Sequence, residues 1–253
     1  MREFFLNLFQ EGESSLEISL FSVWHFLYLF LIIGMAFLIT FILKNKNESL
    51  KQLILKIFAY LVPALYIADF LIMPLAREDF TINVDKLPFH ICTLMSFFVP
   101  FAQFNKNFKP IKETIVCLTL VASLMYICYP GSAVGDISPF AYEVVQTFMY
   151  HGCMFVWGFL SLTIGGVELK YKNIWKEAVG ICLIILWASF GNAVYSNSEH
   201  HYDWFFVTGS TFPFIPSFLM PFVVLAAVYG MCAIIYTIYY FVKKKIESKT
   251  TKI

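Results

Sequence analysis

Nucleophilic and basic side chains lie close together in one apolar stretch, Leu87–Phe104, which reads LPFHICTLMSFFVPFAQF. His90, Thr93 and Ser96 recur every three residues, so on a helix they share one face, which Cys92 flanks. A thiol or hydroxyl beside an imidazole base is the arrangement of nucleophilic acyl transfer, in which a covalent acyl intermediate forms. Cys92 or Thr93 is therefore the candidate nucleophile.

A second polar stripe leads to the candidate base. Glu143, Thr147 and His151 recur every four residues and line one face of a helix, with His151 roughly 15 Å along it. A carboxylate such as Asp69 or Glu143 would orient the imidazole. Ionisable groups in apolar segments are costly, so they are retained for chemistry, for a pathway or for a buried contact. A structural hydrogen bond is the alternative role for each of these residues.

Two short segments, HIC at 90–92 and HGC at 151–153, place a His and a Cys two residues apart. Such pairs could suggest metal ligands. Residues two apart on a helix diverge by about 200°, so the two side chains of a pair do not face one ion. We therefore expect no metal and no cofactor.

Composition identifies the elements that must carry these groups. Of the 253 residues, 59% are hydrophobic and 14% charged, and the mean hydropathy is +0.72, which is too apolar for a soluble domain. Continuous apolar runs near the roughly 20 residues of a spanning helix occur at 18–43, 52–75, 87–104, 113–129, 140–164, 174–196 and 213–241. The sequence predicts an all-α, polytopic membrane protein, a seven-transmembrane-helix bundle forming one domain over residues 1–253.

The loops between these runs predict the orientation of the bundle. All but three of the 18 lysines and arginines lie in or beside the first, third and fifth gaps or after the last run; the exceptions are Arg2, Arg77 and Lys86. Short cytoplasmic loops collect such residues, so we expect the N-terminus outside and the C-terminus in the cytoplasm of a multi-pass cell-membrane protein. The net charge of +1 carries no information on nucleic acid, but the basic residues are confined to the loops and form no patch interleaved with aromatics, so we expect membrane lipid and no nucleic acid as partner.

Polar groups concentrate in the outer halves of the predicted helices, whereas the cytoplasmic halves read as nearly pure Phe, Ile, Leu and Val. Scattered structural polar groups would show no preference for one leaflet, so we expect a single cavity open to the outer side or outer leaflet. Packing is the commoner role for a lone histidine such as His25. The expected site comprises Cys92, Thr93 and His151 as catalytic residues, lined by His25, Asp69, His90, Glu143, Thr147 and Asn192.

Three segments resemble the YwaF-type family of bacterial integral membrane proteins, namely LPFHICTLMSFF at 87–98, YHG at 150–152 and GNAVYSNSEHHYDWFFVTGS at 191–210. The resemblance extends over nearly the whole chain in the order of the spans. That family is similar to eukaryotic membrane acyltransferases that act on ether glycerophospholipids with a Cys and a His, and more distantly to membrane hydrolases of fatty-acid esters with a Thr and a His. The resemblance implies Cys92 or Thr93 as nucleophile and His151 as base.

Three classes of function fit these features. The first is an enzyme that transfers lipid acyl groups or cleaves acyl esters. The alternative is a non-enzymatic binding or transport protein that uses the same cavity for a small polar ligand or a proton, with transport responding to Asp69. The third is a structural or assembly protein. A retinal-type photoreceptor is excluded because the last run, 213–241, contains no lysine for a Schiff base.

Overall fold

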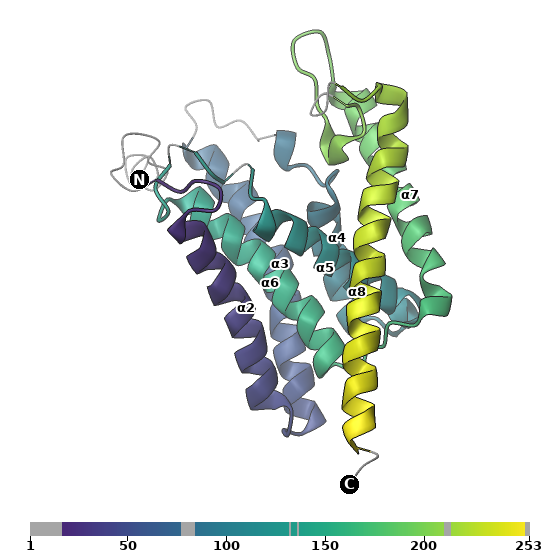
Figure 1. Ribbon diagram of the computed structural model, residues 1–253. Helices are drawn as coiled ribbons and strands as arrows, with labels where there is room; N and C mark the ends of the chain where they lie inside the picture. Colours follow the sequence, from purple (N-terminus) through teal and green to yellow (C-terminus); the bar gives the residue numbers. More distant parts are fainter. Residues whose placement is uncertain (1–16, 77–83, 132, 136, 210–213, 251–253) are drawn as a thin grey trace.

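The computed structural model describes residues 17–76, 84–131, 133–135, 137–209 and 214–250, and within them the chain forms helices and no strand. Short 3-10 turns occupy several of the connections. The long helices are α2 (Val23–Leu43), α3 (Glu48–Ala76), α4 (Ile91–Phe104), α5 (Lys112–Cys128), α6 (Tyr142–Thr163), α7 (Trp175–Tyr195) and α8 (Met220–Thr250) (Figure 1). The predicted all-α class is confirmed for this part of the chain.

Each predicted apolar run overlaps one of these long helices, but the helices differ in how well their length and composition suit a membrane crossing. Five of them, α2, α3, α5, α7 and α8, are long and apolar enough to do so. Helix α4 has only 14 residues. Helix α6 has 22 residues, but Glu143, Gln146 and His151 interrupt its first half. The chain is thus a multi-pass membrane protein, while seven crossings and the orientation of the termini stay predictions.

The helix ends differ from the predicted runs for local reasons. Helix α4 begins at Ile91, four residues after the start of its run, because Pro88 disfavours helix in the residue before it and His90 occupies the N-cap. Helix α8 continues past residue 241 to Thr250. Its last turns are rich in Lys and Glu, which favour helix as strongly as apolar residues do. Hydropathy marks the apolar part of a helix and not its full length.

Helices α5 and α6 form the centre of the bundle. Every residue of α5 from Thr114 to Ser123 is buried. Helices α2, α3 and α4 pack around this pair, and α7 and α8 contact each other and α5 (Figure 1). Large apolar side chains on α2, α7 and α8, such as Phe30, Leu183 and Phe222, face outward and are more than half exposed, as lipid contact requires.

The two ends of the bundle are distinguished by which helices begin there. We call the end at which α2, α4, α6 and α8 begin the outer end, and the opposite end the inner end, in keeping with the predicted orientation. Helix α2 begins and α8 ends at opposite ends of the bundle (Figure 1). This arrangement agrees with an odd number of long helices in the described part of the chain.

The contact between α5 and α6 depends on a glycine. A Cβ atom at Gly158 would lie 2.7 Å from the Cγ atom of Leu120. The Gly158→Ala variant should therefore unfold more easily, by about 1–3 kcal/mol, because Leu120 must leave its position in a packed core. Thermal unfolding in detergent would measure this, with Gly34→Ala as the control, since a Cβ atom at Gly34 meets nothing within 4 Å. Equal stability of the two variants would contradict the prediction.

Candidate functional site

The first turn of α4 carries the candidate nucleophiles. The Cys92 sulfur lies against the backbone N–H groups of Cys92 and Thr93. The Thr93 hydroxyl donates to the carbonyl of His90 at 2.9 Å, and the Ser96 hydroxyl donates to the carbonyl of Thr93 at 2.6 Å. Both hydroxyls are therefore committed to the backbone of their own helix. The N-cap residue His90 accepts a hydrogen bond at Nδ1 from the N–H of Phe205, 3.2 Å away.

His151 lies buried in α6 with one ring nitrogen engaged and the other free. Its Nδ1 atom is 2.9 Å from the carbonyl oxygen of Thr147, and its ring stacks on that of Tyr126 with centroids 3.8 Å apart. A carbonyl only accepts, so Nδ1 carries the proton and Nε2 holds a lone pair. The buried Nε2 has no hydrogen-bond partner in the described part of the chain. His151 is thus oriented as a neutral base.

Two tyrosines join α3 and α6 to the start of α4. The Tyr150 hydroxyl donates to the carbonyl of Cys92 at 2.8 Å, and the Tyr66 hydroxyl donates to the carbonyl of Lys86. The two phenol rings lie 6.3 Å apart. His151 directly follows Tyr150 and is within electrostatic range of His90, the N-cap of α4, so the candidate base lies in the same region as the start of α4.

An ion pair completes this region. Asp69 on α3 is only 3% exposed, and its Oδ2 atom lies 2.8 Å from the Lys86 ammonium. Lys86 is also within electrostatic range of the Cys92 sulfur and of the His151 imidazole. We call this group of residues the α4–α6 cluster; its members are Tyr66, Asp69, Lys86, Cys92, Tyr150 and His151.

The predicted orienting carboxylates hold other positions. Asp69 pairs with Lys86, and a backbone carbonyl, that of Thr147, holds His151 in their place. Glu143 is half-buried at the start of α6. The Thr147 hydroxyl bonds to the Gln146 side chain at 3.3 Å. Within the stripe of Glu143, Thr147 and His151, it is therefore the backbone carbonyl of Thr147 that orients the imidazole.

The side chains of His25 and Asn192 bond to structural elements around the α4–α6 cluster and are not part of it. Both ring nitrogens of His25 are bonded, with Nε2 2.8 Å from the carbonyl of Ile127 and Nδ1 accepting from the N–H of Phe21 at 3.0 Å. Asn192 at the end of α7 bonds twice to the backbone of Trp204, accepting at 2.9 Å and donating at 3.3 Å. His25 joins α2 to α5, and Asn192 holds a loop.

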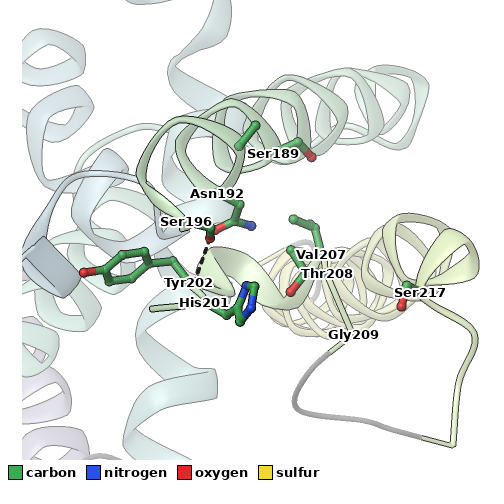
Figure 2. A pocket seen from close by; sticks show the side chains of 10 residues that line it. Ser189, Asn192, Ser196, His201, Tyr202, Val207, Thr208, Gly209 and Ser217 are labelled. Carbon is green, nitrogen blue, oxygen red and sulfur yellow. Dashed lines mark hydrogen bonds between the residues drawn. The ribbon is translucent and has the colours of Figure 1, made fainter. Parts of the chain in front are cut away.

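That loop, residues 196–209, packs over the start of α4. Trp204 and Phe205 are each 2% exposed, and the Trp204 indole N–H donates to the carbonyl of Asp85 at 3.3 Å. Beside the loop is a groove of about 520 Å³ (Figure 2). Several uncharged polar residues line it, namely Ser189, Asn192, Ser196, His201, Thr208 and Ser217. Asn192 therefore lines a groove that the α4–α6 cluster does not line.

Asn192 gives a direct test of how the loop is held. The Asn192→Ala variant leaves the buried N–H and carbonyl of Trp204 unpaired, at a cost of about 1–3 kcal/mol. We expect faster amide hydrogen exchange over residues 202–207, measured by mass spectrometry. The control is Ser189→Ala, which lies one turn away in the same groove. Equal exchange in the two variants would show that Asn192 does not hold the loop.

Sequence reasoning missed several members of the site. Lys86 appeared only as one of three cations on the outer side, Tyr150 only within the YHG segment, and Tyr126 not at all. One signal was available for Tyr66, which precedes Asp69 by three residues and so shares its helix face. Among the described residues, no three of the His, Cys, Asp and Glu side chains lie close enough to hold a metal ion.

The fold and this cluster define a class: a multi-pass, all-helical membrane protein with a buried imidazole, a thiol and an ion pair near one end of the bundle. The chain belongs to the TMEM164 family, whose model matches residues 20–242. No curated protein and no solved structure matches the chain. The resemblance to YwaF-type proteins stays a prediction.

Proposed function

We propose that the protein is an enzyme of the cell membrane that transfers lipid acyl groups or cleaves acyl esters, with Cys92 as nucleophile and His151 as base. The observation that carries the proposal is the lone pair on Nε2 of His151, which is buried, oriented and unpartnered. Leaving a buried polar atom unpaired costs about 1–3 kcal/mol. A buried polar atom without a hydrogen-bond partner is typical of a site where a substrate or a transferable proton supplies that partner.

The chemistry follows from these two groups. His151 Nε2 takes the proton of the Cys92 thiol, and the thiolate attacks the ester carbonyl of a lipid. The tetrahedral intermediate collapses to an acyl-thioester, and the imidazolium returns its proton to the departing alcohol. A lipid hydroxyl then accepts the acyl group in transfer, or water accepts it in hydrolysis, with His151 again as base.

The start of α4 favours the negative charge that develops in this reaction. The first N–H groups of a helix have no partner within it and form the positive end of its dipole. The Cys92 sulfur lies against two of them, and the Lys86 ammonium adds a positive charge nearby. Burial of the Cys92 sulfur disfavours a thiolate, and these two features offset part of that cost for the thiolate and for an adjacent oxyanion.

Cys92 is favoured over Thr93 as the nucleophile. The Thr93 hydroxyl already donates its proton to the carbonyl of His90. A thiol is also far more acidic than a hydroxyl, so it needs less help from a neutral imidazole. No hydrogen bond joins Cys92 to His151 among the described residues, so the two must approach each other when substrate is bound, as is common for catalytic pairs.

Covalent labelling tests the proposal. The protein in lipid nanodiscs would be treated with an electrophilic long-chain acyl probe and digested, and the labelled peptide identified by mass spectrometry. We expect label on Cys92, lost in Cys92→Ala and kept in the matched control Cys153→Ala, a half-buried thiol of α6. Label on Thr93 would make the hydroxyl the nucleophile.

The alternative class predicts a different outcome. A protein that only binds or transports a ligand would take up no covalent label at Cys92 or Thr93. It would instead bind ligand equally well in Cys92→Ala, and its uptake would respond to Asp69→Asn. That combination would refute the enzymatic proposal.

A further inference from the structure

A buried carboxyl group lies at the inner end of the bundle, far from the α4–α6 cluster along the helices. Glu177 in the first turn of α7 is 0% exposed. Its Oε1 atom accepts a hydrogen bond of 2.6 Å from the hydroxyl of Tyr236 on α8. Its Oε2 atom is buried without a partner, and so is the nearby hydroxyl of Thr114 on α5. This end of the bundle was expected to be apolar, and Glu177 corrects that expectation.

A second carboxyl group shares the same phenol. Glu113 Oε1 lies 3.2 Å from the Tyr236 hydroxyl and also accepts from the backbone N–H of Lys170. Glu113 Oε2 accepts from the Asn173 amide at 2.7 Å. A phenol has a single proton, which it donates to one acceptor at a time. One hydroxyl proton therefore lies between two carboxyl groups, and both oxygens of Glu113 are already engaged.

No basic side chain neutralises this pair in the described part of the chain. The groups that face Glu177 are Glu113 and Cys117 on α5 and Tyr236 on α8, with Cys232 beside Cys117. All are acids. The amines of the nearby lysines bind elsewhere: Lys112 to Gln103, Lys176 to Pro110 and Lys170 to Glu168. Two adjacent carboxylates without a counter-ion are strongly disfavoured in such surroundings.

We infer that Glu177 is a proton-binding site that holds a proton on Oε2 at neutral pH and thereby joins α5, α7 and α8 at the inner end. A protonated Oε2 donates one hydrogen bond, and the Thr114 hydroxyl, which lies beside this carboxyl group and can accept as well as donate, is the acceptor at hand. A metal cation fits less well, because hard cations take six or more oxygen ligands and only one carboxylate oxygen is free here.

Proton binding at Glu177 couples packing to pH. An unfolded glutamate releases its proton near pH 4.3, so between that pH and the higher pH at which Glu177 itself ionises, the folded chain binds more protons than the unfolded chain. The contribution of this site to stability therefore falls as pH rises. When Glu177 loses its proton, the carboxylates of Glu113 and Glu177 repel each other on either side of the Tyr236 hydroxyl. This repulsion weakens the packing of α7 and α8 against α5.

Infrared difference spectroscopy tests the inference on the purified full-length protein at about pH 7. We expect the C=O band of a protonated carboxylic acid, absent in Glu177→Gln and kept in Glu199→Gln, which changes an exposed glutamate of the outer loop. If Glu177→Gln does not fold, Tyr236→Phe serves, because loss of its hydrogen bond must shift the band to higher frequency. A missing band, or one that neither variant alters, overturns the inference.

Thermal unfolding at about pH 5 and about pH 9 gives a second readout. Glu177→Gln imitates the protonated acid, so it should match the wild type at the lower pH and exceed it at the higher pH. The same difference between the two proteins at both pH values overturns the inference. So does a wild type that is stabilised by sodium chloride and not by N-methylglucamine chloride, since a metal ion then fills the site.

Discussion

Replacing His151 with glutamine is expected to lower the rate of acyl transfer from a labelled phospholipid by at least about a thousandfold, because losing the base of a nucleophilic pair costs that much or more. Glutamine keeps a polar side chain of similar size in this buried position, but its amide offers no lone pair that takes up a proton at neutral pH. Covalent labelling of Cys92 should fall in parallel. Both rates are measured in nanodiscs under conditions in which the variant is shown to be folded.

The matched control is His201→Gln, which changes a histidine that lines the groove outside the α4–α6 cluster. It should keep nearly the full rate. A His151→Gln variant that retains more than about a hundredth of the activity would remove His151 from the mechanism, because general bases contribute at least about a hundredfold. Activity that survives there while Cys92→Ala is inactive would point to another base.

Breaking the Asp69–Lys86 ion pair should have the largest effect on stability. In Lys86→Met the carboxylate of Asp69 stays buried without a positive partner, and its Oδ1 atom already lacks a hydrogen bond. We expect a loss of about 3 kcal/mol in the free energy of unfolding, the lower end for buried pairs, because the Lys86 side chain is one-third exposed. Chemical denaturation in mixed micelles would measure it.

Two further variants serve as controls for the loss of stability in Lys86→Met. Asp69→Asn combined with Lys86→Met should recover most of the loss, because no charge is then left buried and unpaired. Lys51→Met breaks the pair with Glu48, whose side chain is 72% exposed, and should change stability by less than about 0.5 kcal/mol. A double variant as unstable as Lys86→Met alone would show that the pair matters for another reason.

The architecture was predictable because one physical requirement dominates it. A helix that meets lipid must be apolar over most of its length, so long apolar runs mark the helices directly. The prediction was weaker where protein replaces lipid as the neighbour. Helix α4 is short and α6 carries polar groups, and hydropathy alone therefore does not decide how they cross the membrane.

The site was less predictable because its contacts depend on backbone atoms and on distant parts of the chain. The sequence indicated that Asp69 needs a partner, but not that Lys86 would supply it from a separate segment. The spacing of Thr147 and His151 indicated a shared face, and the structure uses the carbonyl of Thr147 in place of its hydroxyl. Glu177 went unnoticed because a lone acid near a predicted helix end resembles an ordinary interfacial residue.

The length of α8 offers a route to an experimental structure. The helix continues from the apolar Phe241 to Thr250, about 14 Å at 1.5 Å per residue. In this part of α8, Lys243 forms a 2.7 Å ion pair with Glu168 in the loop before α7. A small rigid protein fused to this helix without a break would move as one body with the bundle. It would give electron cryomicroscopy a visible landmark on a 29.2 kDa chain that is otherwise hidden in its micelle.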